Sequence, residues 1–175
     1  MDLKIVLKKA AGISLVLFDC DGILTDGGLH VLATGEEVRR FDVHDGYGIR
    51  MLHYAGVRTG IVSGKESESV RERAQHLGME IVRLGNFDKL QELTEILEST
   101  GLSAENVAYA GDDIFDIPAM KAAGLSLSVS NARPQAREAA DYVTEAAGGH
   151  GAVREMAELI LKAKGLLGPD GDVRR

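Results

Sequence analysis

Two aspartates stand two residues apart at the end of an apolar run. Asp19 and Asp21 directly follow the nearly continuous apolar segment 13–18 and precede Gly22. A carboxylate placed there can attack phosphorus and form an acyl phosphate, which divides one difficult hydrolysis into two easier steps. A second carboxylate nearby can protonate the leaving alkoxide and later deprotonate the attacking water. Because short acidic turns that cap helices or bind water are common, this motif alone leaves both interpretations open.

A second acidic cluster follows another apolar run further along the chain. Asp112, Asp113 and Asp116 come just after residues 107–110. If both runs are parallel strands, these carboxylates reach the same sheet edge as Asp19. Magnesium takes hard oxygen ligands, and so many convergent negative charges would otherwise raise one another's pKa. Capping of a helix N-terminus remains the alternative role for Asp113 and Asp116.

Two smaller signals lie between the acidic clusters. Ser63, Gly64 and Lys65 place a hydroxyl, a flexible glycine and a cation after a third apolar run. The Ser63 hydroxyl and nearby backbone N–H groups could bind a phosphoryl oxygen at a helix start. Lys89 begins a helical pattern and could balance the charge of the nucleophile and the transferring phosphate. Taken singly, an ordinary helix start and a solvated lysine explain these residues equally well.

The elements that must position these residues follow an alternating pattern. Four apolar runs have the composition of strands buried on both faces, at 13–18, 57–62, 107–110 and 125–129. Helical patterns accompany them at 48–55, 67–77, 88–99, 116–123 and 152–164. Strands alternating with helices of this length predict an α/β fold. We expect a doubly wound, mainly parallel, Rossmann-like sheet flanked by helices.

One segment interrupts this alternation. Residues 29–32 and 38–41 flank a turn-prone stretch at 33–36, which predicts a β-hairpin over about residues 28–42, inserted after the first strand. The chain of 175 residues is otherwise expected to form one domain, 1–175. The Gly- and Asp-containing tail, 165–175, is expected to be mobile by itself.

Composition narrows the class of protein. A net charge of −7 without a basic block argues against nucleic acid as a partner. No stretch approaches the roughly 18 apolar residues needed to span a bilayer, and the first residues lack the pattern of a signal peptide. Cys20 is the single cysteine, which excludes an internal disulfide and fits a reducing compartment. We therefore expect a cytoplasmic protein with no membrane partner.

The four signals, in this order, resemble the haloacid dehalogenase superfamily of aspartate-nucleophile phosphotransferases. The resemblance implies a magnesium-dependent phosphatase in which Asp19 is the nucleophile, Asp21 the general acid and base, and Lys89 the charge-balancing lysine. It also implies that Ser63 binds phosphate. The implied metal ligands are Asp19, the backbone carbonyl of Asp21, and Asp112, with Asp113 and Asp116 supporting that site.

Three longer sequence segments resemble the family of 3-deoxy-D-manno-octulosonate 8-phosphate phosphatases, which act in lipopolysaccharide precursor synthesis. These segments are residues 41–50, 106–113 and 148–155. The resemblance implies a keto-sugar-acid phosphate as substrate, bound with help from Gly64, Lys65 and Asp45. It further implies a cap-less homotetramer in which neighbouring subunits close the active site and the four hairpins form a small barrel.

Two departures from that family concern groups that could meet a sugar-acid carboxylate. Lys65 stands where the family has arginine and keeps the charge without the planar fork. His150 replaces a second arginine with a group that titrates near neutrality. They leave open a phosphatase of 2-keto-3-deoxynononate 9-phosphate or another sugar phosphate. The intact Asp19–Asp21 pair argues against a non-catalytic oligomerising domain, because nothing structural requires both acids. The chain is also too long for a phosphoacceptor receiver domain.

Overall fold

A six-stranded parallel sheet forms the centre of the molecule, described here by a computed structural model over residues 2–174. The strand order is β5-β4-β1-β6-β7-β8, and every pairing is parallel. The strands are β1 (Leu15–Phe18), β4 (Arg58–Ser63), β5 (Ile81–Leu84), β6 (Val107–Ala110), β7 (Leu125–Ser128) and β8 (Tyr142–Val143). The predicted α/β fold with a parallel sheet is confirmed.

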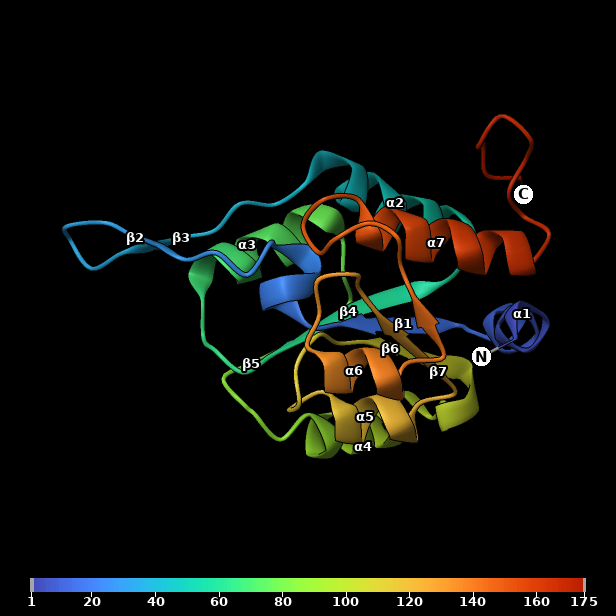
Figure 1. The fold of residues 1–175 in the computed structure, drawn as a ribbon, viewed down its shortest axis with the longest axis horizontal. Coiled ribbons are helices and arrows are strands. Elements are labelled where there is room, and N and C mark those ends of the chain that lie inside the picture. Colours follow the sequence, from blue (N-terminus) through green and yellow to red (C-terminus); the bar gives the residue numbers. More distant parts are fainter. Residues whose placement is uncertain (1, 175) are drawn as a thin grey trace.

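Helices cover both faces of this sheet (Figure 1). In chain order they are α1 (Leu3–Ala11), α2 (Val43–Tyr54), α3 (Glu68–Leu77), α4 (Lys89–Thr100), α5 (Ile117–Ala122), α6 (Pro134–Ala139) and α7 (Ala152–Ala163). Strand β1 shows how the two layers share one strand. Val16 and Phe18 pack into the core with α1, α2, α3 and α7, whereas Leu15 and Leu17 pack with α4 and α5. This alternation follows from the two-residue period of a strand, and it explains why the run at β1 is apolar throughout.

The site lies where the strand order reverses. After β1 the chain builds outward through β4 and β5, and it then returns to β6 on the other side of β1. In open α/β sheets, the carboxyl ends of the strands at such a reversal form the crevice where ligands bind. The acidic residues that follow β1 and β6 are therefore brought together by the topology alone.

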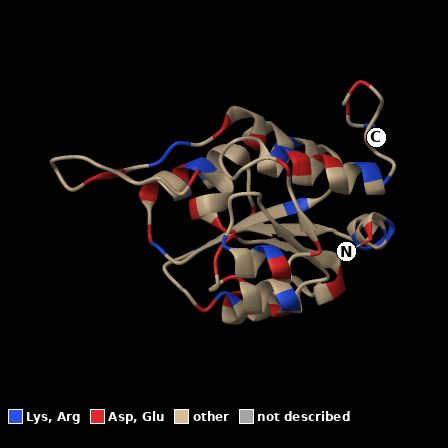
Figure 2. Cartoon of the chain, in the orientation of Figure 1, with Lys and Arg blue, Asp and Glu red and all other residues tan. Residues whose placement is uncertain are grey.

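A β-hairpin follows the first strand, as the sequence predicted. Its two strands are short, β2 (His30–Val31) and β3 (Glu37–Val38), and they pair antiparallel. The hairpin extends from the body of the protein (Figure 1). Residues 27–35, which include its tip, contain no Lys, Arg, Asp or Glu (Figure 2). Four of its large apolar side chains are exposed, namely Leu29, Val31, Leu32 and Val38. The protruding ribbon therefore leaves apolar side chains exposed in the single chain.

Several elements differ from the sequence-based expectation. The edge strands β5 and β8 were missed because partly exposed residues interrupt their apolar runs. Helix α2 begins at Val43 rather than near Gly48, since the carboxylate of Asp42 accepts a hydrogen bond from the His44 N–H at 2.7 Å and caps the helix there. Helices α1 and α6 were not predicted either.

The tail, for which mobility was predicted, makes contacts with itself and with the core. Leu167 and Val173 form an antiparallel bridge, and both pack with Leu166 against the main core. The described part of the tail therefore folds back on itself. Among residues 2–174, no helix combines the length and the apolar character that crossing a membrane requires.

Candidate active site

A tight turn after β1 brings the two acidic clusters face to face. It is η1 (Cys20–Leu24), and within it Gly22 has a φ of +99°. A Cβ at this glycine would lie 2.2 Å from a carboxylate oxygen of Asp112. Only glycine permits both this backbone conformation and this close approach. The glycine that follows the Asp19–Asp21 pair is thus a packing requirement of the site.

Asp19 forms a buried ion pair with Lys89. The Lys89 Nζ donates to Asp19 Oδ1 at 2.8 Å, and it also donates to the backbone carbonyl of Val62. Lys89 is the first residue of α4, and only 3% of its side chain is exposed. The alternative of a solvated surface lysine is therefore wrong. A buried cation beside the candidate nucleophile can offset the negative charge that gathers during phosphoryl transfer.

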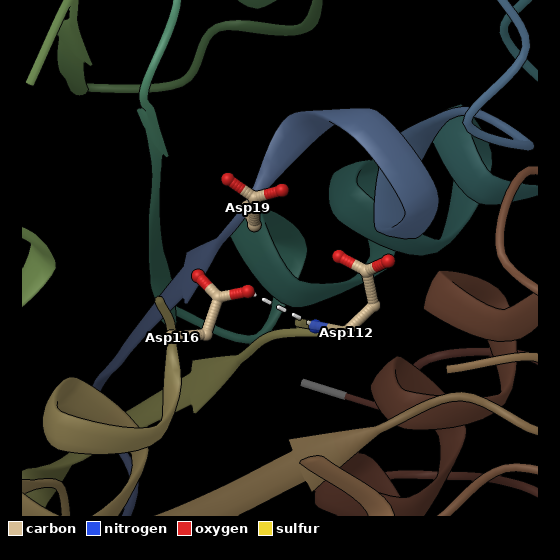
Figure 3. A group of neighbouring side chains, drawn as sticks. All are labelled: Asp19, Asp112 and Asp116. Carbon is tan, nitrogen blue, oxygen red and sulfur yellow. Dashed lines mark hydrogen bonds between the residues drawn. The ribbon is translucent and has the colours of Figure 1, made fainter. Parts of the chain in front are cut away.

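Three carboxylates converge at the ends of β1 and β6 (Figure 3). Asp19, Asp112 and Asp116 each place an oxygen within 4.8 Å of the others. Burial, reinforced by the charge of Asp116 and opposed by Lys89, raises the pKa of Asp19 to about 7. Burial and the charges of Asp19 and Asp116 raise the pKa of Asp112 to about 8. The raised pKa values show that these carboxylates repel one another when ionised. A hard divalent cation such as Mg²⁺, which prefers oxygen ligands, would offset that repulsion.

Asp116 also organises the loop that carries Asp112. One of its oxygens accepts hydrogen bonds from the backbone N–H groups of Asp112 at 3.1 Å and Asp113 at 3.2 Å. The other accepts from the Tyr109 hydroxyl at 3.2 Å. The Asp113 carboxylate accepts from the Ile114 N–H at 2.6 Å. Asp116 therefore supports the loop from within rather than capping α5, for which its side chain makes no capping bond.

Asp21 has a different partner from the other acids, and the sequence did not predict it. Arg39, which follows β3, contacts both carboxylate oxygens of Asp21, with Nε–Oδ1 at 2.8 Å and Nη2–Oδ2 at 3.3 Å. The hydrogen bonds with Asp21 raise the pKa of Arg39, although burial opposes this. The Asp21 carboxylate is consequently not among the three that converge. A basic residue in the hairpin was visible in the sequence, but nothing in its spacing indicated this contact.

A cavity of about 270 Å³ opens over these residues. Its walls are formed by Asp19, Asp21, Gly27, Leu29, Ser63, Gly64, Lys65, Phe87, Lys89, Asp112, Asp113, Phe115 and Asp116. Ser63 is buried, whereas Lys65 is half exposed and lies 3.7 Å from a carboxylate oxygen of Glu37. The rings of Phe87 and Phe115 pack edge to face, with their centroids 5.6 Å apart, and form an apolar part of the cavity wall. One cavity thus contains the candidate nucleophile Asp19, the cation of Lys89 and a candidate metal site.

Comparisons with known proteins agree with this arrangement. Residues 64–156 match the family model of haloacid dehalogenase-like hydrolases. The 3-deoxy-D-manno-octulosonate 8-phosphate phosphatase of Escherichia coli K12 is 42% identical over 162 residues, which cover 93% of this chain and 86% of that protein. The chain is a haloacid dehalogenase-like hydrolase. It belongs with the phosphatases of that family.

Solved structures of other family members share the fold of this hydrolase. The octulosonate phosphatase from Moraxella catarrhalis, in complex with magnesium, phosphate and 3-deoxy-D-manno-octulosonate, has a TM-score of 0.91 and 39% identity, with 94% of each chain covered. A cobalt-bound enzyme from Haemophilus influenzae has a TM-score of 0.87 and 40% identity, covering 90% of this chain and 92% of that one. The cations seen in these relatives accord with the donor set here.

Two residues that the sequence associated with substrate lie outside the cavity wall of this hydrolase. Asp45 is buried, and its carboxylate accepts from the backbone N–H groups of Gly151 at 3.2 Å and Arg154 at 2.9 Å. It ties α2 to the start of α7, and its expected role in substrate binding stays a prediction. His150 is exposed, and its ring lies 3.0 Å from the Gly148 carbonyl and 3.5 Å from Arg40.

Proposed function

We propose that this chain hydrolyses 3-deoxy-D-manno-octulosonate 8-phosphate to the free sugar acid and phosphate. The observation that carries the proposal is the buried Asp19–Lys89 pair beside three convergent carboxylates, in one cavity of a chain 42% identical to an octulosonate phosphatase. A phosphate monoester brings the negative charge that Lys89 and a cation would offset. The cavity opens to the surface, so the sugar can extend outward from the phosphate.

The chain's own residues account for both steps. The Asp19 carboxylate attacks phosphorus while the bond to the sugar oxygen breaks, and Asp21 gives that oxygen its proton. Water then attacks phosphorus, Asp21 takes the proton of the water, and Asp19 leaves as a carboxylate. Lys89 and the Ser63 hydroxyl would hold the charged oxygens in both steps. Magnesium, held by Asp19 and Asp112 with Asp116 close by, would supply electrophilic stabilisation of the phosphoryl group.

The assembly we propose is a homotetramer with shared active sites. Support comes from the exposed apolar side chains of the hairpin, of which Val31 is 65% exposed. Leu29 lines the cavity at the root of the same hairpin, so whatever covers the hairpin lies close to the site. Neighbouring subunits would then close the cavity that one subunit leaves open. With one cysteine, buried in the turn after β1, the protein would work in the cytoplasm.

Substrate choice is the part of the proposal most open to measurement. Lys65 at the cavity wall could meet a carboxylate of either an eight- or a nine-carbon sugar acid. Phosphate release should be followed with and without Mg²⁺ on the octulosonate ester, on 2-keto-3-deoxynononate 9-phosphate and on simple hexose phosphates. We expect the highest magnesium-dependent kcat/KM on the octulosonate ester. A higher kcat/KM on the nine-carbon ester, or similar values on all esters, would contradict the proposed substrate but leave the proposed phosphatase reaction intact.

A further inference from the structure

Arg39 behaves unlike the rest of the hairpin to which it belongs. The neighbouring strand residues Glu37 and Val38 are exposed, whereas only 2% of the Arg39 side chain is exposed. Its guanidinium turns inward to the cavity edge while the apolar side chains of the hairpin point outward. Burying so much of an arginine requires partners for its donors.

Each nitrogen of this guanidinium has an oxygen partner. Besides the two contacts with Asp21, Nη1 donates to the Ser67 hydroxyl at 3.1 Å and Nη2 to Glu37 at 3.2 Å. Ser67 is the residue before α3, so Arg39 is fixed to the body of the protein as well as to its own hairpin. A guanidinium that contacts both oxygens of a carboxylate fixes its plane as well as its position.

Asp21 depends on this contact for its orientation. Among the described residues, the Asp21 carboxylate has no hydrogen-bond partner other than Arg39, and 29% of the side chain is exposed. Asp19, two residues earlier, is instead held by Lys89 from the core. The two acids of the motif are thus oriented by two cations that belong to different parts of the fold.

We propose that Arg39 is a positioning residue, which holds the Asp21 carboxyl group where it can protonate the leaving oxygen. This inference rests on the proposed role of Asp21 as the general acid. Arg39 itself transfers no proton, and it acts on the reaction only through the Asp21 carboxyl group that it contacts. Its effect is to limit the side-chain conformations of Asp21, so that the acid stays at the cavity wall during cleavage. Because Arg39 lies on the hairpin, displacement of the hairpin would also displace the acid.

The test compares leaving groups that need a proton with one that does not. An alkyl phosphate such as the sugar ester requires protonation of its alkoxide, whereas p-nitrophenyl phosphate releases a stable phenolate. The parameter to compare is kcat/KM, since it reports on the steps up to leaving-group departure and is independent of the later hydrolysis of the aspartyl phosphate. We expect Arg39→Met to lower kcat/KM on the sugar ester by about 10–100-fold, part of the range for general acid catalysis, and by less than about threefold on p-nitrophenyl phosphate.

Three further variants decide between positioning and general damage. Arg39→Lys, which keeps the charge without the fork, should fall between wild type and Arg39→Met on the sugar ester. Arg40→Met is the matched control, because Arg40 neighbours Arg39 but contacts the Gly149 carbonyl, His150 and Asp42 instead of Asp21. It should leave kcat/KM on both substrates nearly unchanged. Asp21→Asn should show the same leaving-group dependence more strongly, and adding Arg39→Met to it should cost little more.

The outcomes separate this inference from the function on which it rests. Equal losses on both substrates for Arg39→Met would overturn the positioning role. If Asp21→Asn showed no leaving-group dependence, the assignment of the acid would itself be wrong. Circular dichroism and sedimentation velocity on every variant show whether the fold and assembly survive. If Arg39→Met fails to fold, Arg39→Lys decides the matter, since wild-type kcat/KM on the sugar ester would reject the proposal.

Discussion

The sheet edge and the hairpin hold their side chains in opposite ways. At the sheet edge, Asp19 and Lys89 are buried and paired with each other inside one chain. On the hairpin, large apolar side chains such as Val31 are exposed, whereas Arg39 is buried against Asp21. The first region forms its contacts within one chain, and the second is the surface that we propose is covered in an assembly. The proposed chemistry and the proposed assembly thus involve different structures, which meet at Asp21.

The largest effect should come from the sheet edge. Asp19→Asn removes the proposed nucleophile and should lower phosphate release by on the order of 10⁴–10⁶-fold, as loss of a nucleophile does in other hydrolases. The fold and assembly should persist, because the amide has nearly the same shape. Phosphate release by freshly purified protein is the measurement. A reduction of less than about 10⁴-fold, once deamidation is excluded by mass spectrometry, would contradict the assignment of Asp19 as nucleophile.

The same edge should make stability depend on pH. The pKa values of Asp19 and Asp112 rise from 3.8 to about 7 and about 8 in the folded chain without a bound cation. Between about pH 4 and pH 8 the folded chain then holds more protons than the unfolded chain, so its stability falls as the pH rises through that window. Magnesium binds the deprotonated folded state and should reverse the loss.

Thermal unfolding with a chelator and with Mg²⁺, at pH 5.5 and pH 8, tests this expectation. We expect Mg²⁺ to stabilise the protein at pH 8 by at least about 2 kcal/mol, or roughly 4–8 °C in a domain of this size, and by less at pH 5.5. Asp112→Asn is the matched control. It should be more stable than wild type at pH 8 with chelator, and it should gain little from Mg²⁺. Equal magnesium effects at both pH values would contradict the coupling.

The sequence predicted the sheet edge far better than the contacts of the hairpin. Asp19 and Asp112 follow buried apolar runs, and the parallel topology then brings them together without further information. Lys89 was recognised only through the order of the motifs, since nothing local distinguishes it from a surface lysine. Motif and topology together thus predict the residues attached to the ends of core strands.

The contacts that were missed lie between segments whose approach no local pattern encodes. Arg39 reaches Asp21 across the hairpin, and Asp45 reaches the backbone at Gly151 and Arg154 more than a hundred residues away. Both side chains are polar and lie near glycines or turns, so their sequence context suits a ligand contact as well as a structural one. The packing of α2 against α7 brings Asp45 to these backbone groups, which the sequence did not indicate.

Asp45 provides a smaller effect that tests this distinction. Asp45→Ala leaves two backbone N–H groups without their acceptor and should lower the free energy of unfolding by about 1–3 kcal/mol. Asp45→Asn keeps one oxygen acceptor and should lose less. Denaturant unfolding gives the stability, and phosphate release should show KM changed by less than about threefold. A large rise in KM with unchanged stability would instead support the substrate-binding role predicted from the sequence.

The smallest effect on the subunit's own fold should come from the hairpin, together with a clear effect on assembly. Val31 is mostly exposed and belongs to neither core cluster, so Val31→Asp should change the far-ultraviolet circular dichroism spectrum little and the intrinsic stability of a subunit by no more than about 0.5 kcal/mol. If hairpins pack together, however, the new carboxylate must be buried against apolar surface, which is costly. Sedimentation velocity should then show smaller species.

Ile5→Asp is the matched control, since Ile5 is a similarly exposed apolar residue on α1. It should leave the assembly unchanged. If the Val31 variant dissociates and its kcat/KM on the sugar ester falls while that on p-nitrophenyl phosphate is kept, the hairpin acts on catalysis through the leaving group, as its link to Asp21 requires. If the variant dissociates with full activity on both substrates, each subunit has a complete site. The hairpin would then serve assembly alone, and the sheet edge would carry the chemistry without it.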